Sequence, residues 1–302
     1  MLKLTDALSL EGYGVTAILM CMVLVWACCA ALVYGVADYF GGRATKISRA
    51  AAVTFLGQSV ALVLLAIIIA FGNTPVMSTH DWWWSGLAGA GGAIALVAFY
   101  QAMSLGSMTV VAPISAIVGM CSPVVAGLLQ GERPARIAYI GMALAIVAVA
   151  LVGDMLDHHD LPTPIRAMFF AFISGLGFGV IFVCLAQTSD DAGLWPLLGQ
   201  RMVSVPTVGL LALWGSGRIH VARRVLPLAA LSGLLDTTAN GLYLLAVHGG
   251  MLSLVGVITA LYPVSTVGLA ITLDKEKLHN SQIVGLVLAA LSLAMVGFAA
   301  NS

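Results

Sequence analysis

The chain has 302 residues, of which 61% are hydrophobic and only 9% are charged, with no net charge and a mean hydropathy of +1.04. Soluble domains carry about 25% charged residues, so this chain cannot cover its own surface in water. The composition excludes a soluble globular domain, and the absence of net charge argues against nucleic-acid binding. We therefore predict an all-α integral membrane protein.

Apolar runs long enough to cross a bilayer recur along the chain, because a spanning helix needs about 20 apolar residues. Short polar connectors separate the runs and carry most of the charge. These runs predict ten transmembrane helices that follow an N-terminal tail. The runs lie near 18–40, 50–71, 83–104, 107–129, 135–153, 165–187, 194–214, 226–247, 250–273 and 279–299.

The last five predicted helices repeat the first five at an offset of 143 or 144 residues. Tyr100 corresponds to Tyr243, and Gly141 corresponds to Gly285. Because five is an odd number, the second repeat enters the membrane in the opposite sense, as is typical of secondary transporters. We expect two inverted five-helix repeats, with these divisions: tail 1–17, first repeat 18–153, linker loop 154–164 and second repeat 165–299.

Residues that break helices occupy matching positions in the fourth and ninth predicted helices. A proline inside a helix removes a backbone hydrogen bond and bends the axis. In a membrane such breaks are tolerated where neighbours or a cavity satisfy the freed carbonyl groups. Packing kinks are one explanation, and the pairing of the breaks favours helices that bend around a central cavity. The candidate hinge residues are Pro113, Gly119, Pro123, Gly256 and Pro263.

Residues 107–153 contain Pro123, a Gly-Glu-Arg-Pro turn at 131–134 and Gly141. This segment resembles the C-terminal part of an EamA repeat, from the drug/metabolite transporter superfamily. Residues 253–297 resemble the same part, and the resemblance extends over 17–299. It implies a ten-helix transporter that works by alternating access and usually exports small metabolites, amino acids or toxic compounds.

The resemblance also implies an arginine in the second helix of a repeat. The second half has Arg201 there, whereas the first half has Gly57 at the equivalent position. Any role that needs an arginine in both halves is therefore excluded.

Asp236 is the deepest acidic residue, about ten residues from either end of the predicted helix 226–247. Asn240 and Tyr243 follow on the same helical face, and Thr237 lies beside them. An ionised group at mid-bilayer costs roughly 2.5–3.5 kcal/mol, so it needs a partner, a proton or a wet cavity. We expect this face to line a cavity and bind a polar solute.

Arg201 lies at nearly the depth of Asp236, with a difference of about 6 Å that its side chain can span. Two interpretations remain open. A buried Arg201–Asp236 pair can simply hold two helices together, although buried pairs are poor net stabilisers. Alternatively, the pair opens to bind solute, or Asp236 takes up and releases a proton.

Three further residues complete the candidate site. Asp38 closes the predicted first span, with Tyr34 one turn before it, so a position at the membrane interface explains Asp38. Facing the cavity is the alternative for this residue. Tyr100 is included as the repeat counterpart of Tyr243.

No phosphate-binding loop, HExxH motif or GxSxG motif is present. We predict a secondary transporter that is not an enzyme, needs no cofactor or metal, and exports a small-molecule solute with protons or another coupling ion. His158 and His159 are not expected to form a metal site. The alternatives are a flippase for an amphipathic or lipid-linked cargo, and a non-transporting receptor or assembly protein. The sequence does not specify the oligomeric state.

The orientation in the plasma or inner membrane is predicted differently by the resemblance and by the basic residues. The usual family arrangement places both termini in the cytoplasm, and we adopt it. The positive-inside rule favours the reverse. With cytoplasmic termini, the basic residues inside are Lys3, Arg133 and Arg136, and those outside are Arg43, Lys46, Arg49, Arg166, Arg218, Arg223, Arg224, Lys275 and Lys277.

Overall fold

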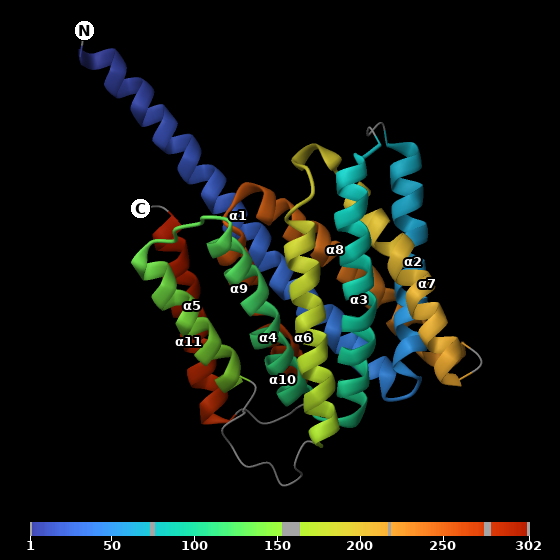
Figure 1. The fold of residues 1–302 in the computed structure, drawn as a ribbon. Coiled ribbons are helices and arrows are strands. Elements are labelled where there is room, and N and C mark those ends of the chain that lie inside the picture. Colours follow the sequence, from blue (N-terminus) through green and yellow to red (C-terminus); the bar gives the residue numbers. More distant parts are fainter. Residues whose placement is uncertain (1, 73–75, 153–163, 217–218, 275–278, 301–302) are drawn as a thin grey trace.

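The computed structural model describes residues 2–72, 76–152, 164–216, 219–274 and 279–300, and these form helices and connectors without a strand. Most of the predicted linker, including both of its histidines, lies outside the described residues, as do Arg218, Lys275 and Lys277. The α-helices (Figure 1) are α1 (Leu2–Thr45), α2 (Ala50–Phe71), α3 (Thr79–Leu105), α4 (Met108–Leu129), α5 (Arg136–Val152), α6 (Ile165–Leu185), α7 (Trp195–Ser216), α8 (Leu226–Gly249), α9 (Leu252–Thr259), α10 (Pro263–Asp274) and α11 (Asn280–Ala300). Two short 3₁₀ helices are η1 (Asp190–Ala192) and η2 (Arg223–Val225).

Within the described residues, eight helical segments are long and apolar enough to cross a membrane. They are Met20–Thr45, Ala50–Phe71, Thr79–Leu105, Val110–Leu129, Ile165–Leu185, Trp195–Trp214, Leu252–Leu269 and Asn280–Phe298. α5 is apolar but has only 17 residues, and the 24-residue α8 carries Asp236, Thr237 and Asn240 near its middle. The chain is thus a multi-pass membrane protein, and the predicted number of ten spans is not confirmed.

α1 is much longer than the predicted first span. Its 44 residues correspond to about 66 Å, roughly twice the thickness of the hydrocarbon core. Figure 1 shows its N-terminal part extending beyond the other helices. The segment expected to be a separate tail therefore has a helical backbone continuous with the first span.

The helices of the two sequence halves interleave in the bundle. α1 packs along α8, and α3 packs along α6. In the repeat, α6 corresponds to α1 and α8 corresponds to α3. The two interfaces are therefore equivalent: in each, the first helix of one half packs against the third helix of the other half. α1 runs away from the end of the bundle where both termini lie, and α6 runs toward it (Figure 1). Opposite directions of equivalent helices are what an inverted repeat requires.

Close contacts between helices occur at glycines, as is common in membrane proteins. A Cβ atom on Gly233 of α8 would lie 2.1 Å from the carbonyl oxygen of Gly57 on α2. A Cβ on Gly57 would in turn lie 2.7 Å from the carbonyl oxygen of Ala229. No side chain fits at position 57 without separating the two helices. This contact is a physical reason why the first half lacks the counterpart of Arg201.

The helix break is present in the second half only. α4 continues through Pro113, Gly119 and Pro123 as one helix. By contrast, the ninth predicted helix is divided into α9 and α10, which begins at Pro263. Proline lacks an N–H donor and disfavours the helical conformation of the residue before it, which ends α9. The halves therefore differ in the helices that carry the candidate hinges.

Hydrogen bonds between connectors join the two halves at both ends of the bundle. Glu132, after α4, accepts hydrogen bonds from the backbone N–H groups of Leu252 and Ser253 at the start of α9. Asp81 accepts one from the backbone N–H of Ser189 at 2.8 Å. At the other end, the Ser48 hydroxyl accepts one from the backbone N–H of Ala222 at 3.1 Å. Charged acceptors at helix N-termini also interact favourably with the helix dipole.

Candidate functional site

Arg201 of α7 and Asp236 of α8 form a buried ion pair. Nη2 of Arg201 lies 2.6 Å from Oδ2 of Asp236, and the arginine side chain is only 1% exposed. The same guanidinium donates hydrogen bonds to the Thr237 hydroxyl from Nε at 3.1 Å and from Nη2 at 2.8 Å. The two depths inferred from the sequence are thus close enough for direct contact. Removing either partner would leave a charge buried without compensation.

A small cavity of about 10 Å³ lies beside this pair. Such a volume holds about one water molecule. The cavity is enclosed by residues of both sequence halves: Tyr34, Asp38, Phe178, Ile181, Phe182, Asp236, Asn240 and Tyr262. They belong to α1, α6, α8 and the break between α9 and α10. Interleaving of the halves therefore brings one acidic residue from each half to a common space.

Asp38 is buried inside the bundle, which contradicts the expectation of an interfacial position. α1 continues to Thr45, and Asp38 is 5% exposed. No hydrogen bond or ion pair joins its carboxyl group to any other described residue. Because α1 packs along α8, Asp38 faces the same cavity as Asp236. The site therefore contains two carboxyl groups and one guanidinium.

Asn240 contributes an unused acceptor. Its Nδ2 donates a hydrogen bond to the backbone oxygen of Asp236 at 2.7 Å. Its Oδ1 is buried and has no hydrogen-bond partner among the described residues. A buried polar atom without a partner costs free energy. Asp236 and Asn240 of α8 thus both line the cavity, whereas Thr237 and Tyr243 do not.

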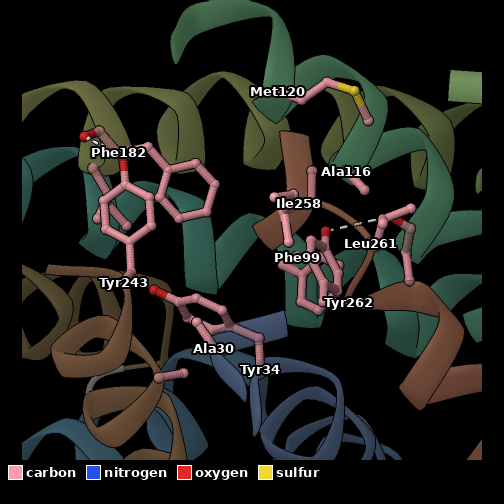
Figure 2. Close-up of a cluster of buried hydrophobic side chains, with 14 of the residues drawn as sticks. Ala30, Tyr34, Phe99, Ala116, Met120, Phe182, Tyr243, Ile258, Leu261 and Tyr262 are labelled. Atoms are coloured by element: carbon pink, nitrogen blue, oxygen red, sulfur yellow. Dashed lines mark hydrogen bonds between the residues drawn. The ribbon is translucent and has the colours of Figure 1, made fainter. Parts of the chain in front are cut away.

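Two of the predicted tyrosines support the site without lining it. Tyr243 donates its hydroxyl to the backbone oxygen of Phe182 at 2.9 Å, and the two ring centroids lie 4.6 Å apart. Figure 2 shows Tyr34, Phe182 and Tyr243 in one group of rings, with Phe99 and Tyr262 in a second. The hydroxyl of Tyr100 pairs with that of Ser232 at 2.7 Å, which ties α3 to α8.

Apart from Tyr34, the aromatic residues of the lining were missed by the sequence analysis. Phe178, Phe182 and Tyr262 line the cavity but carry no charge that would single them out in an apolar helix. A signal did exist, because Phe178 and Phe182 stand 144 residues after Tyr34 and Asp38. Applying the repeat to these candidates would have found both phenylalanines.

A larger cleft of about 610 Å³ lies at the end of the bundle opposite the termini. It is formed by the connector between α1 and α2, with Gln101 and Ser104 of α3 and Leu211 of α7. None of the buried ionisable side chains lines it. We therefore assign the candidate site to the smaller cavity.

Comparisons with known proteins agree with this architecture. The sequence profile of the EamA-like transporter family matches residues 22–153 and 165–298. A solved structure titled "Crystal structure of protein" is 13% identical and superposes with a TM-score of 0.69, covering 91% of this chain and 96% of its own. At this identity the likeness shows the fold alone. No curated protein matches the chain.

Proposed function

The chain belongs to the EamA-like transporter family, within the drug/metabolite transporter superfamily, and we propose that it is a secondary active transporter. It exports a small metabolite, amino acid or drug-like solute by alternating access through the central cavity. Protons or another ion supply the driving force. Ten spans in two inverted repeats, in the plasma or inner membrane, form the transport unit.

The observation that carries this proposal is the charge count at the cavity. Arg201 neutralises Asp236 at 2.6 Å, whereas Asp38 has no cationic partner among the described residues. An uncompensated carboxylate in an apolar interior is expensive. A proton or a positively charged solute at the cavity removes that cost. Binding and release of a cation at the cavity can therefore shift the equilibrium between arrangements of the two halves.

The transport proposal is tested by a ligand screen followed by counterflow. Purified protein in detergent is screened for thermal stabilisation with soluble metabolites and drugs, where a ligand at a hundredfold excess over its dissociation constant stabilises by about 2.7 kcal/mol. Each hit is then assayed in proteoliposomes. We expect Asp38→Asn to abolish counterflow, and Asp190→Asn, at an 81% exposed side chain, to leave it intact. Counterflow that persists in Asp38→Asn would contradict the proposed role of the cavity.

We propose cytoplasmic termini, and cysteine labelling tests this orientation. The five native cysteines are replaced first, and Lys46→Cys or Arg136→Cys is introduced at exposed positions at opposite ends of the bundle. In intact cells, a membrane-impermeant maleimide is expected to label position 46 directly and position 136 only after lysis. The opposite pattern would show that the basic residues determine the orientation.

A further inference from the structure

We propose that the central cavity is selective for a monovalent organic cation, an amine with an aromatic or otherwise apolar body. This inference rests on the proposed transport function and specifies the chemical class of its cargo.

The charges that face the cavity are all acidic. Its described lining includes the carboxyl groups of Asp38 and Asp236 and no basic side chain. Arg201 is 1% exposed and is not part of the lining, because Asp236 and Thr237 hold its guanidinium behind the wall. An anionic solute would therefore meet carboxylates without reaching the arginine. A zwitterion would lack a partner for its carboxylate for the same reason.

The hydrogen-bond groups of the cavity match an ammonium group. Three side chains of the lining have oxygens that accept no hydrogen bond from any described residue: both carboxyl oxygens of Asp38, Oδ1 of Asp236 and the buried Oδ1 of Asn240. A primary ammonium has three N–H donors and no acceptor. Binding such a group satisfies the unused acceptors and neutralises the excess negative charge together.

Aromatic rings provide the rest of the surface that a cation would meet. Tyr34, Phe178, Phe182 and Tyr262 line the cavity. Cations bind favourably over the faces of aromatic rings, and more so when desolvated. Tyr243 packs against Phe182 at 4.6 Å between ring centroids and donates to its backbone. The Phe182 ring is thus held in place by Tyr243, which belongs to the same sequence half.

The cavity volume indicates that this conformation is closed around the site. About 10 Å³ is too small for an organic amine, so the cargo binds in a conformation in which the halves have moved apart. Alternating access supplies such a conformation, and the volume alone does not decide between cargo classes. The unused hydrogen-bond acceptors and the negative charge of the lining decide in favour of a cation.

Four probes of similar size and different charge test the inference. They are phenethylamine, 2-phenylethanol, 3-phenylpropionate and phenylalanine, which are respectively cationic, neutral, anionic and zwitterionic at pH 7. Binding to the full-length protein in detergent is measured by calorimetry and thermal shift. We expect phenethylamine to bind at least about tenfold more tightly than the other three, since hydrogen bonds to charged groups are the stronger ones. Equal or weaker binding of the amine would overturn the inference.

Variants of Asp38 locate the binding. Asp38→Asn is expected to weaken phenethylamine binding about 10- to 100-fold, Asp38→Glu to retain part of it, and the exposed Asp190→Asn to leave it unchanged. Unchanged affinity in Asp38→Asn would overturn the assignment to this cavity. If Asp38→Asn fails to fold, the Asp38→Glu variant and the wild-type probe series decide the question.

The two proposals fail in different ways. Counterflow of screened solutes without amine binding would support the transport function and contradict the selectivity for organic cations. Amine binding without any solute movement in proteoliposomes would leave the cation site standing and refute transport.

Discussion

Replacing Arg201 or Asp236 alone lowers the free energy of unfolding by about 3–5 kcal/mol, whereas replacing both residues together restores most of it. Arg201→Met leaves two carboxyl groups buried without a cation, and Asp236→Leu leaves a guanidinium that is only 1% exposed without an anion. In the double variant no charge of the pair remains, and apolar side chains fill the space. Buried pairs replaced in this way are often neutral or stabilising.

Unfolding of the two single variants and the double variant in detergent measures this effect as a double-mutant cycle. We expect a coupling energy on the order of 5 kcal/mol or more, because two single losses of about 3–5 kcal/mol each nearly disappear in the double variant. The refolded double variant also tests function, because it has lost one of the two cavity carboxyl groups and is expected to move no solute. A double variant as unstable as the sum of the singles would mean that the pair contributes packing alone. Normal transport by that variant would remove Asp236 from the mechanism.

Gly233→Ala separates α2 from α8 and destabilises the protein by about 1–3 kcal/mol or more. The added methyl group would lie 2.1 Å from the carbonyl oxygen of Gly57 and 2.4 Å from its Cα atom. Both are backbone atoms that cannot rotate away, so one helix has to move. Asp236 lies one turn further along α8, so the movement also displaces its carboxyl group from Arg201. Loss of ligand-induced stabilisation is expected together with the loss of stability.

Gly268→Ala is the matched control for this variant. Gly268 lies in α10, and a Cβ atom there would have no neighbour within 4 Å. Alanine is the better helix former by about 1 kcal/mol, so this variant is expected to be neutral or slightly stabilising. Thermal unfolding of the two variants under identical conditions compares them. Equal effects at positions 233 and 268 would show that the α2–α8 contact tolerates a side chain.

The fold was predictable to the extent that it follows from apolar periodicity and from the repeat. Long apolar runs require helices in a membrane, and the constant offset predicted that α1 and α6 are equivalent helices. The packing of each against a helix of the other half was not predicted. The extent of α1 was not predictable, because composition marks where a helix enters the hydrocarbon and not where its backbone ends. The sequence predicted matching breaks in the fourth and ninth helices, and only the ninth is interrupted, at residues 260–262. α4 remains continuous although it contains Pro113 and Pro123, because a proline can bend a helix without ending it.

The site was predictable where residues share one helix and less so where helices meet. Asp236 and Asn240 were placed on one face by their spacing, since i and i+4 positions neighbour each other in any α-helix. The contact with Arg201 followed from similar depths in two consecutive helices. Asp38 was misplaced because its depth was measured from an assumed end of the first span. The aromatic lining depends on how α1, α6 and the break between α9 and α10 pack together, which no local pattern encodes.

The break between α9 and α10 has no counterpart in the first half. This difference affects the rates at which the cavity opens, but not the solute gradient that transport can reach. Tyr262, a wall of the cavity, lies in the interruption between α9 and α10, whereas the equivalent helix of the first half, α4, is unbroken. In the proposed alternating-access cycle, a movement of α9 and α10 can bend the chain at residues 260–262, whereas a movement of α4 displaces one continuous helix. We therefore expect the inward-opening and outward-opening steps to have different rates. The solute gradient at which net transport stops is the same in either case, because it depends on the free energies of the solute and ion gradients and not on the rates of the opening steps.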